Sequence, residues 1–197
     1  MGKLIVYAVD TETTNLSEEV GDIIEISLLR TSDMQQKTWW IKPTNPDGID
    51  DGALKVNGYL REDLLWQTDA GKEKFKLLDE VLPQIENWVY DDGEVPFNRI
   101  LAGHNVSFDE KFIKKAWQKI GCVDTYPFSS YGMLIDTKSL TLFYDWMNGL
   151  HNEKYNLGAC IKKFGLEKRK YHGAEEDTKS AYDLLMHLSK AFNKEIK

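Results

Sequence analysis

Short apolar runs alternate with polar segments along the chain, and the runs fall into two kinds. The shorter ones are rich in β-branched and aromatic residues, which is typical of buried strands. They span residues 3–9, 23–30, 37–42 and 99–104. The polar segment 31–36 predicts a turn, and residues 43–61 are rich in Pro, Gly, Asn and Asp, which predicts a loop with one helical turn.

The longer runs carry apolar residues at three- and four-residue spacing, which predicts amphipathic helices. In residues 73–89 this pattern is made by Phe75, Leu78, Leu82, Ile85 and Val89. The same spacing predicts helices over residues 109–120, 156–164 and 177–192. Strands come first and then alternate with helices, so we expect an α/β layered domain with a mixed sheet.

Composition places the chain among ordinary globular proteins and narrows its partners. With 197 residues, of which 42% are hydrophobic and 29% charged, we expect a single domain over residues 1–197. No apolar run is long enough to span a membrane, and the apolar N-terminal stretch is too short for a signal peptide. The two separated cysteines predict reduced thiols in a cytoplasmic protein. The net charge of −7 argues against a broad electrostatic grip on nucleic acid, but bound cations can reverse the local charge of a site.

Two carboxylates follow the first apolar run in the sequence VDTET. Asp10 and Glu12 are two residues apart, so a strand would point both to one face. Like charges at that spacing repel each other unless a cation lies between them. A solvated strand end is the ordinary alternative, because D-x-E is a common tripeptide.

Two further acids stand at the starts of predicted helices. Asp109 follows the strand at 99–104 in the sequence HNVSFD, and Asp177 follows His172 in the sequence HGAEED. Either acid alone is explained by the preference for acids in the first turn of a helix. A single loop histidine is ordinarily just solvated.

Taken together, these acids favour a metal site. Oxygen ligands from separate segments suit hard divalent cations such as Mg²⁺ or Mn²⁺. Two such ions can activate a water and stabilise the leaving oxygen of a phosphodiester. A proton acceptor with a pKa near neutrality is still needed, and His172 is the histidine placed to provide it.

The motifs resemble those of the DEDDh 3′–5′ exonucleases, a family that includes the proofreading epsilon subunit of bacterial DNA polymerase III, ribonuclease T and oligoribonuclease. VDTETTNL looks like the first motif, HNVSFD like the second, and HGAEED like the third, H-x-A-x-x-D. The resemblance runs over about residues 4–190 and includes GDIIEISLL, IDT and YNLGACIKKFGL as minor signals. It implies a ribonuclease H-like exonuclease fold with a five-stranded mixed sheet flanked by helices.

The resemblance also implies a role for each matching residue. Asp10, Glu12 and Asp177 would hold one ion, Asp10 would bridge to a second ion supported by Asp109, and His172 would be the general base. Thr13 and Leu16 match positions that contact the 3′-terminal nucleotide, with Leu16 wedged against the last base. His104 and Asn105 match positions close to the substrate strand.

Two positions depart from the family pattern. Asn15 stands where the family usually has glycine, and we expect it to adopt the left-handed conformation that the turn would need. Asn57 stands where many relatives carry histidine, which puts a substrate contact there in doubt.

The substrate stays open between nucleic acids, since the family hydrolyses both. We expect a DNA exonuclease, standalone or recruited by a polymerase, and the alternatives are an exoribonuclease and an inactive nucleic-acid-binding module. Phe108 is either a core residue or a stacking platform, and the basic run 162–170 is either a solvated loop or a phosphate contact. Residues 43–72 are a candidate loop over the site. A polymerase partner and a homodimer are both compatible with the sequence, and no membrane partner is expected.

Overall fold

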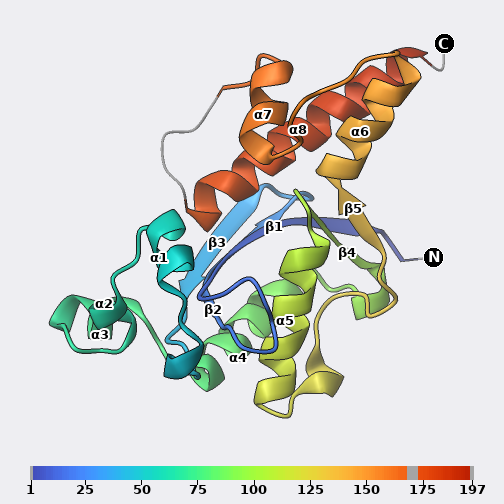
Figure 1. The fold of residues 1–197 in the computed structure, drawn as a ribbon. Coiled ribbons are helices and arrows are strands. Elements are labelled where there is room, and N and C mark those ends of the chain that lie inside the picture. The colour runs from blue at the N-terminus through green and yellow to red at the C-terminus, as the bar shows by residue number, and fades with distance from the viewer. Residues whose placement is uncertain (1, 168–172, 196–197) are drawn as a thin grey trace.

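A computed structural model describes residues 2–167 and 173–195 of the chain (Figure 1). Its centre is a five-stranded sheet with the order β3-β2-β1-β4-β5. The strands are β1 Ile5–Thr13, β2 Ile23–Arg30, β3 Gln35–Trp40, β4 Arg99–Gly103 and β5 Leu134–Asp136. The first three strands form an antiparallel meander, whereas β4 and β5 run parallel to β1, so the sheet is mixed as expected.

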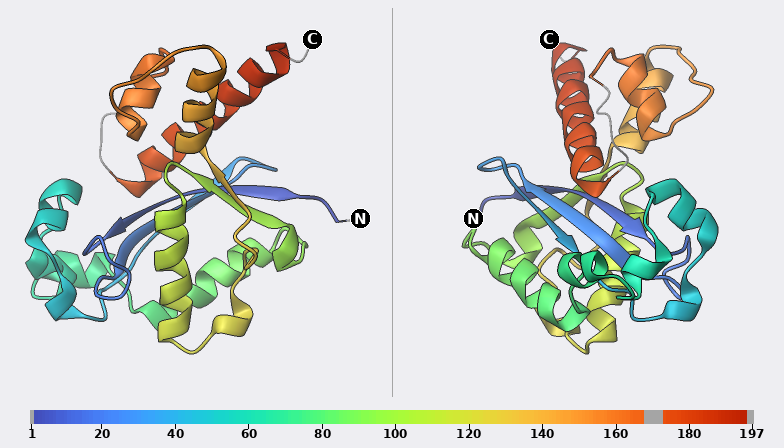
Figure 2. Two further views of the ribbon diagram at one scale, coloured as in Figure 1. Left: turned by 45° about the vertical axis from the view of Figure 1, so that its right-hand side comes forward. Right: turned by 90° about the vertical axis from the view of Figure 1, so that its left-hand side faces the viewer.

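Helices cover both faces of this sheet (Figure 2). They are α1 Asp51–Asn57, α2 Arg61–Leu64, α3 Asp69–Lys74, α4 Leu78–Tyr90, α5 Ser107–Lys119, α6 Thr137–Met147, α7 Leu157–Lys163 and α8 Ala174–Glu195. Helices α4 and α5 enclose the main core against one face. Helix α8 packs on the other face, and α6 and α7 pack against α8. Among the residues that the structure describes, no helix combines the length and apolar character needed to cross a bilayer.

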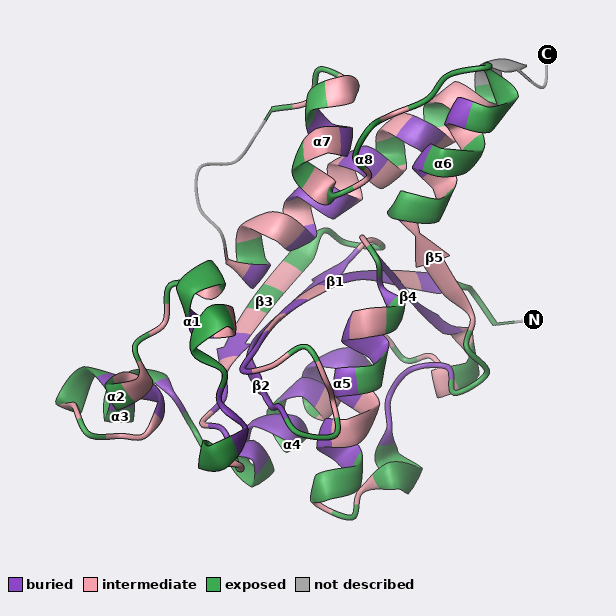
Figure 3. Ribbon diagram, viewed as in Figure 1, coloured by how far each residue is buried: buried purple, intermediate pink, exposed green. Residues whose placement is uncertain are grey.

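The alternation of side chains along β1 decides which residues reach which face. Ile5, Tyr7 and Val9 are buried in the core with α4 and α5. The intervening positions face α8, and toward the end of the strand they are occupied by Asp10 and Glu12. Figure 3 shows that the central strands are largely buried, while the helices alternate between buried and exposed positions. The Asp10 and Glu12 carboxylates therefore lie outside the hydrophobic core, toward the carboxyl end of β1.

One predicted helix is divided in the structure. The segment 73–89 is not continuous, because α3 ends at Lys74 and α4 begins at Leu78. Phe75 is buried in a separate cluster with Ile24, and the Lys76 backbone N–H donates to the Trp40 carbonyl at 3.1 Å. Tertiary pairing thus overrides the helical spacing at Phe75. The loop expected over residues 43–61 contains α1, whose first turn is capped by Asp50 through a 2.9 Å bond from the Ala53 N–H.

Other differences from the sequence reading are smaller. The third strand begins at Gln35, inside the segment expected to be a turn, because the turn is completed by Met34 at φ 60°. Helix α8 begins at Ala174, before the predicted start at 177. The hydrophobic pattern did not indicate β5 or α6, because β5 is short and half-buried and much of α6's apolar surface is exposed.

Candidate active site

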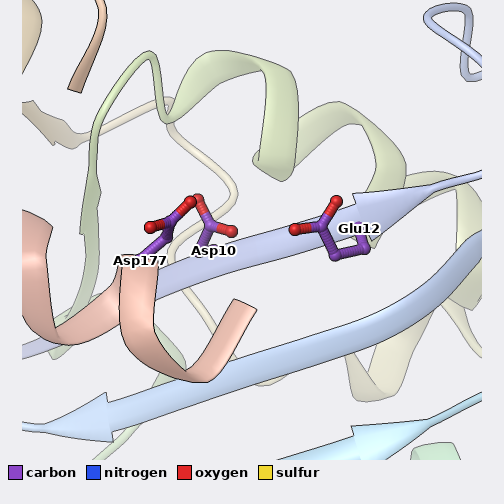
Figure 4. Close-up of side chains that lie close together, drawn as sticks. All are labelled: Asp10, Glu12 and Asp177. Carbon is purple, nitrogen blue, oxygen red and sulfur yellow. The ribbon is translucent and has the colours of Figure 1, made fainter. Parts of the chain in front are cut away.

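Three of the predicted acids converge at the carboxyl end of β1. One carboxylate oxygen from each of Asp10, Glu12 and Asp177 lies within 4.8 Å of the others. Figure 4 shows Asp177, in the first turn of α8, beside Asp10, with Glu12 farther along β1. A set of carboxylate oxygens is the donor chemistry that Mg²⁺ and Mn²⁺ prefer, so these residues suit a hard divalent ion.

Asp109 reaches the same pocket from the opposite face of the sheet. It lies in the first turn of α5, is 4% exposed, and accepts a 2.7 Å hydrogen bond from the Thr11 hydroxyl. Thr11 points toward α5 because it lies between Asp10 and Glu12 on the strand. The pocket has a volume of about 240 Å³ and is lined by Asp10, Thr11, Glu12, Val56, His104, Asn105, Phe108, Asp109 and Asp177.

The pocket is open at this point because two neighbouring strands have unequal lengths. Strand β4 pairs with β1 only as far as Ala8, and it ends at Gly103. A Cβ atom at Gly103 would lie 2.8 Å from the Val9 carbonyl oxygen, so only glycine lets the chain turn away so close to β1. The residues after Gly103 lead directly into α5 and Asp109. Ligands of open α/β sheets bind at such carboxyl ends of strands.

The clustered acids are electrostatically unfavourable without a cation. Burial raises the pKa of Asp10 well above its ordinary value, and the nearby carboxylates of Asp109 and Asp177 raise it further. Burial, followed by repulsion from Glu25 and Asp177, raises the pKa of Glu12 to about 8. Burial raises the pKa of Asp109 to about 7, although the hydrogen bond from Thr11 opposes that rise. Divalent cations would relieve this repulsion.

The sequence reading missed Glu25, a further carboxylate beside the cluster. Glu25 lies opposite Glu12 in the antiparallel register of β1 and β2 and is 4% exposed. The Tyr59 hydroxyl donates a 2.5 Å hydrogen bond to it, and the Trp40 indole N–H donates to the Tyr59 oxygen at 3.2 Å. The signal for Glu25 was the acid within IIEISLL, but its position opposite Glu12 depends on the strand register.

The turn after β1 is built differently from the expectation. Asn15 is absent from the described non-glycine residues with positive φ, so the expected left-handed conformation is wrong. Its side chain shapes the turn instead: Oδ1 accepts from the Ser17 N–H at 3.2 Å, and Nδ2 donates to the Gly48 carbonyl at 3.3 Å. The Thr13 hydroxyl donates to the Asn15 carbonyl at 2.7 Å. Leu16 is left 83% exposed at the tip of this turn.

Asn57 supports the same region from α1. Its Nδ2 donates to the Thr13 carbonyl at 3.1 Å, so its amide holds the turn and α1 together. Its neighbour Val56 is 74% exposed and lines the pocket. The Phe108 ring packs at 4.9 Å against Phe112 at the edge of the core, as one of its two expected roles requires, and it also lines the pocket.

His104 and Asn105 lie at the edge of the pocket, at the turn into α5. Burial lowers the pKa of His104, so the ring is neutral at pH 7. Its Nε2–H donates to the Tyr155 carbonyl at 2.8 Å, and its Nδ1 lies 3.0 Å from the Thr137 hydroxyl. Asn105 adopts the left-handed conformation at φ 65°, a geometry that asparagine tolerates. Its N–H donates to the Asp136 carboxylate at 2.8 Å.

Two of the sequence predictions fall partly or wholly beyond the described residues. His172 lies outside them, as do residues 168–170 of the basic run 162–170. Lys163, at the start of that run, is paired with Asp145, a carboxylate that is 1% exposed. Lys163 is therefore committed to a contact within the protein.

Comparison with known proteins agrees with this geometry. The exonuclease (RNase T) family model matches residues 7–185. The PolC-type DNA polymerase III of Staphylococcus saprophyticus is 28% identical over 179 residues, which cover 90% of this chain and 11% of the polymerase. That of Staphylococcus haemolyticus is 29% identical over 172 residues, or 87% of this chain and 10% of the polymerase. The chain therefore spans about a tenth of the length of these relatives.

Solved structures share the fold. The nuclease domain of 3′hExo, a DEDDh family member bound to rAMP, matches with a TM-score of 0.70 and 15% identity, covering 96% of this chain and 93% of that domain. Escherichia coli exonuclease I in complex with a dA16 oligonucleotide matches with a TM-score of 0.70 and 16% identity, covering 96% of this chain and 41% of that one. The match over residues 7–185, the motifs and the converging acids agree, and the chain belongs to the DEDDh 3′–5′ exonuclease family.

Proposed function

We propose that this protein is a metal-dependent exonuclease that removes nucleotides from the 3′ end of single-stranded DNA. The observation that carries the proposal is the convergence of Asp10, Glu12 and Asp177, with Asp109 in the same pocket. The raised pKa values of Asp10, Glu12 and Asp109 support a site that needs cations, because structural acids are ordinarily paired with bases. Asp10, Glu12, Asp109 and Asp177 would hold two ions, Mg²⁺ or Mn²⁺.

Each protein group has a distinct task in the proposed reaction. When bound, the ions supply an activated water and stabilise the leaving oxygen of the phosphodiester. Thr11 keeps the Asp109 carboxylate aimed into the pocket through its 2.7 Å hydrogen bond. His172 is the proposed general base, which takes the proton of the attacking water.

Exposed apolar side chains around the pocket suit a terminal base. Val56 lines the pocket and is 74% exposed, and Leu16, at the tip of the turn after β1, is 83% exposed. In the pocket, Val56 and the ring of Phe108 offer surfaces on which a base of any identity can stack. Thr13, Leu16 and Val56 are the proposed contacts for the 3′-terminal nucleotide, with His104 and Asn105 close to the strand.

DNA is the proposed substrate, and RNA is the second candidate. The relatives that align with most of this chain are DNA polymerases, and exonuclease I is seen with a DNA oligonucleotide. RNA is favoured by the likeness to 3′hExo, which is bound to rAMP. The polymerase relatives also support a proofreading role beside a polymerase.

The direct test offers labelled single strands of DNA and RNA of equal length to the protein with Mg²⁺, alongside a duplex with a mismatched 3′ end. We expect mononucleotide release from the 3′ end, higher kcat/KM on DNA, and complete loss with a chelator. Ca²⁺ should bind without supporting turnover, because its coordination is looser. Equal release by Asp10→Ala would identify a contaminating nuclease and leave the protein as an inactive binding module.

A further inference from the structure

A second pocket adjoins the proposed catalytic pocket and is lined by different chemistry. It has a volume of about 430 Å³ and is lined by His104, Asn105, Lys138, Lys154, Tyr155, Asn156 and Leu157. His104 and Asn105 line both pockets, so the two spaces meet at these residues. We call the second pocket the strand groove. It adjoins the acidic pocket at the turn between β4 and α5, which contains His104 and Asn105.

The charges of the strand groove are opposite to those of the catalytic pocket. Lys138 and Lys154 are exposed, and neither ammonium group forms an ion pair with a described carboxylate. Elsewhere, Lys115 and Lys119 are paired with Glu19 and Asp22, respectively. In a chain with a net charge of −7, two unpaired lysines in one groove leave a local site for an anion.

The position of Lys138 links this charge to the catalytic pocket. Its Nζ lies 3.4 Å from Oδ1 of Asn105, one of the two residues shared by both pockets. The neighbouring Asp136 carboxylate accepts from the backbone N–H groups of Asn105 and Lys138 at 2.8 and 3.0 Å and from the Ser139 hydroxyl at 2.9 Å. The ammonium group of Lys138 therefore lies at the junction of the two pockets.

The far wall of the groove is held in place by the protein itself. The Tyr155 carbonyl accepts from the His104 ring at 2.8 Å, and the Tyr155 hydroxyl donates to Asp145 at 2.8 Å. Asn156 caps α7 by accepting from the Ala159 N–H at 2.9 Å. The segment that carries Lys154 is thus tied to the turn after β4 and to α6 by the protein's own hydrogen bonds, which lowers the cost of ordering it around a substrate.

We propose that the strand groove binds backbone phosphates on the 5′ side of the scissile bond, and that Lys138 and Lys154 are the residues that neutralise them. The inference rests on the proposed function, because it assumes that the terminal nucleotide occupies the acidic pocket. Phosphate contacts of this kind hold a strand without reading its sequence. The groove would give an acidic protein its grip on a polyanion.

The test compares two substrates that differ only in what lies beyond the scissile bond. The p-nitrophenyl ester of thymidine 5′-monophosphate has a single phosphodiester and a leaving group without phosphates, whereas an octathymidylate strand extends through the groove. In Lys138→Gln/Lys154→Gln, we expect kcat/KM for the octamer to fall about tenfold, the scale of one or two lysine contacts with an anionic surface. The value for the nitrophenyl ester should stay within about twofold of the unmodified protein.

Salt dependence and a control variant sharpen the test. The slope of log kcat/KM for the octamer against log salt should become shallower by about 1.4, or about 0.7 for each lost phosphate contact. Lys190→Gln removes the same charge from an exposed position near the far end of α8 and should change neither substrate. Lys138→Arg/Lys154→Arg should keep the octamer rate, because the charge is retained.

Two results would overturn the inference while leaving the proposed function intact. An unchanged octamer rate in the double Gln variant would show that the groove does not hold the strand. Equal losses on both substrates would show that the lysines act on the catalytic pocket. Failure of the unmodified protein to hydrolyse either substrate with Mn²⁺ would instead reject the proposed function. In that case, binding of a fluorescent octamer in Ca²⁺ would test the strand groove separately. Weaker binding by the double Gln variant would support the groove as the site that holds the strand, and equal binding would reject it.

Discussion

Buried acids lie beside both ends of β1 in opposite electrostatic settings: Asp92, which follows α4, contacts the start of the strand, and Asp10 and Glu12 stand toward its carboxyl end. Near its start, Asp92 forms a 2.7 Å ion pair with Arg99, and the two side chains are 2% and 0% exposed. The Tyr7 hydroxyl donates to the same carboxylate at 2.6 Å, and Arg99 also donates to the Pro127 carbonyl at 3.1 Å. Burial opposes ionisation of Asp92, but the hydrogen bonds from Arg99 and Tyr7 outweigh it and lower its pKa.

At the other end of the strand, Asp10 and Glu12 have raised pKa values and carboxylates for neighbours. In the first arrangement the Asp92 carboxylate has its counter-charge and hydrogen-bond donors within the protein, so it stabilises the fold. We interpret the second as an arrangement that cations from solution complete, and therefore as the site of function. Removing an acid should consequently have opposite effects at the two ends, and the following predictions test that difference.

The largest effect is expected from Asp10→Asn. Activity should fall by about 10³-fold or more, at least the cost of losing one charge-stabilising group at a reacting centre. The metal-free protein should meanwhile become more stable, because one of the repelling carboxylates is gone. Exonuclease rates with Mg²⁺ and thermal unfolding in chelator measure the two effects. A less stable, fully active variant would place Asp10 in the same class as Asp92.

His172→Ala separates metal binding from proton transfer at the catalytic end. We expect the rate to fall by about 10²–10⁴-fold, the range for losing a general base, with metal binding retained. Rates and Mn²⁺ titration of the same variant check both expectations. Loss of metal binding would identify His172 as a ligand.

At the other end, Asp92→Ala should destabilise the protein by about 3–5 kcal/mol, since Arg99 would be left buried without its partner. Urea unfolding measures the change. Asp69→Ala is the matched control, because both side chains of its pair with Lys72 are exposed, and exposed pairs contribute about 1 kcal/mol or less. Equal costs for the two variants would contradict the distinction drawn here.

The pH dependence of the metal-free protein should reveal the raised pKa of Glu12. Between its ordinary value of 4.5 and its folded value of about 8, the folded state holds a proton that the unfolded chain has released. Stability in chelator should therefore fall as pH rises through this window. We expect a loss of roughly 2 kcal/mol, discounted for partial exposure of Glu12, or about 4–8 °C in Tm.

Comparison with Glu12→Gln isolates this contribution. Burial lowers the pKa of His104, so its contribution to stability is lost as pH falls and has the opposite sign. Glu12→Gln leaves His104 unchanged, and its stability should decline less between pH 5 and 8. A decline of equal size would assign the effect to other groups.

The sequence predicted the clustered acids more fully than their surroundings. The strand period placed Asp10 and Glu12 on one face, and the motifs pointed to Asp109 and Asp177, because both signals are local. The hydrogen bond from Thr11 to Asp109 and the position of Glu25 opposite Glu12 depend on contacts between distant segments. The spacing of apolar residues also predicted that Phe75 belongs to the same helix as α4, which is wrong, because its side chain packs beside Ile24.

Calorimetric titration with Mn²⁺ at pH 8 tests most directly whether the acids at the carboxyl end of β1 gather to hold cations. We predict two bound ions for the unmodified protein, protons released on binding because Glu12 is partly protonated, and loss of at least one ion in Asp10→Asn. Absence of Mn²⁺ binding by the folded protein, or unchanged binding by Asp10→Asn, would contradict that claim.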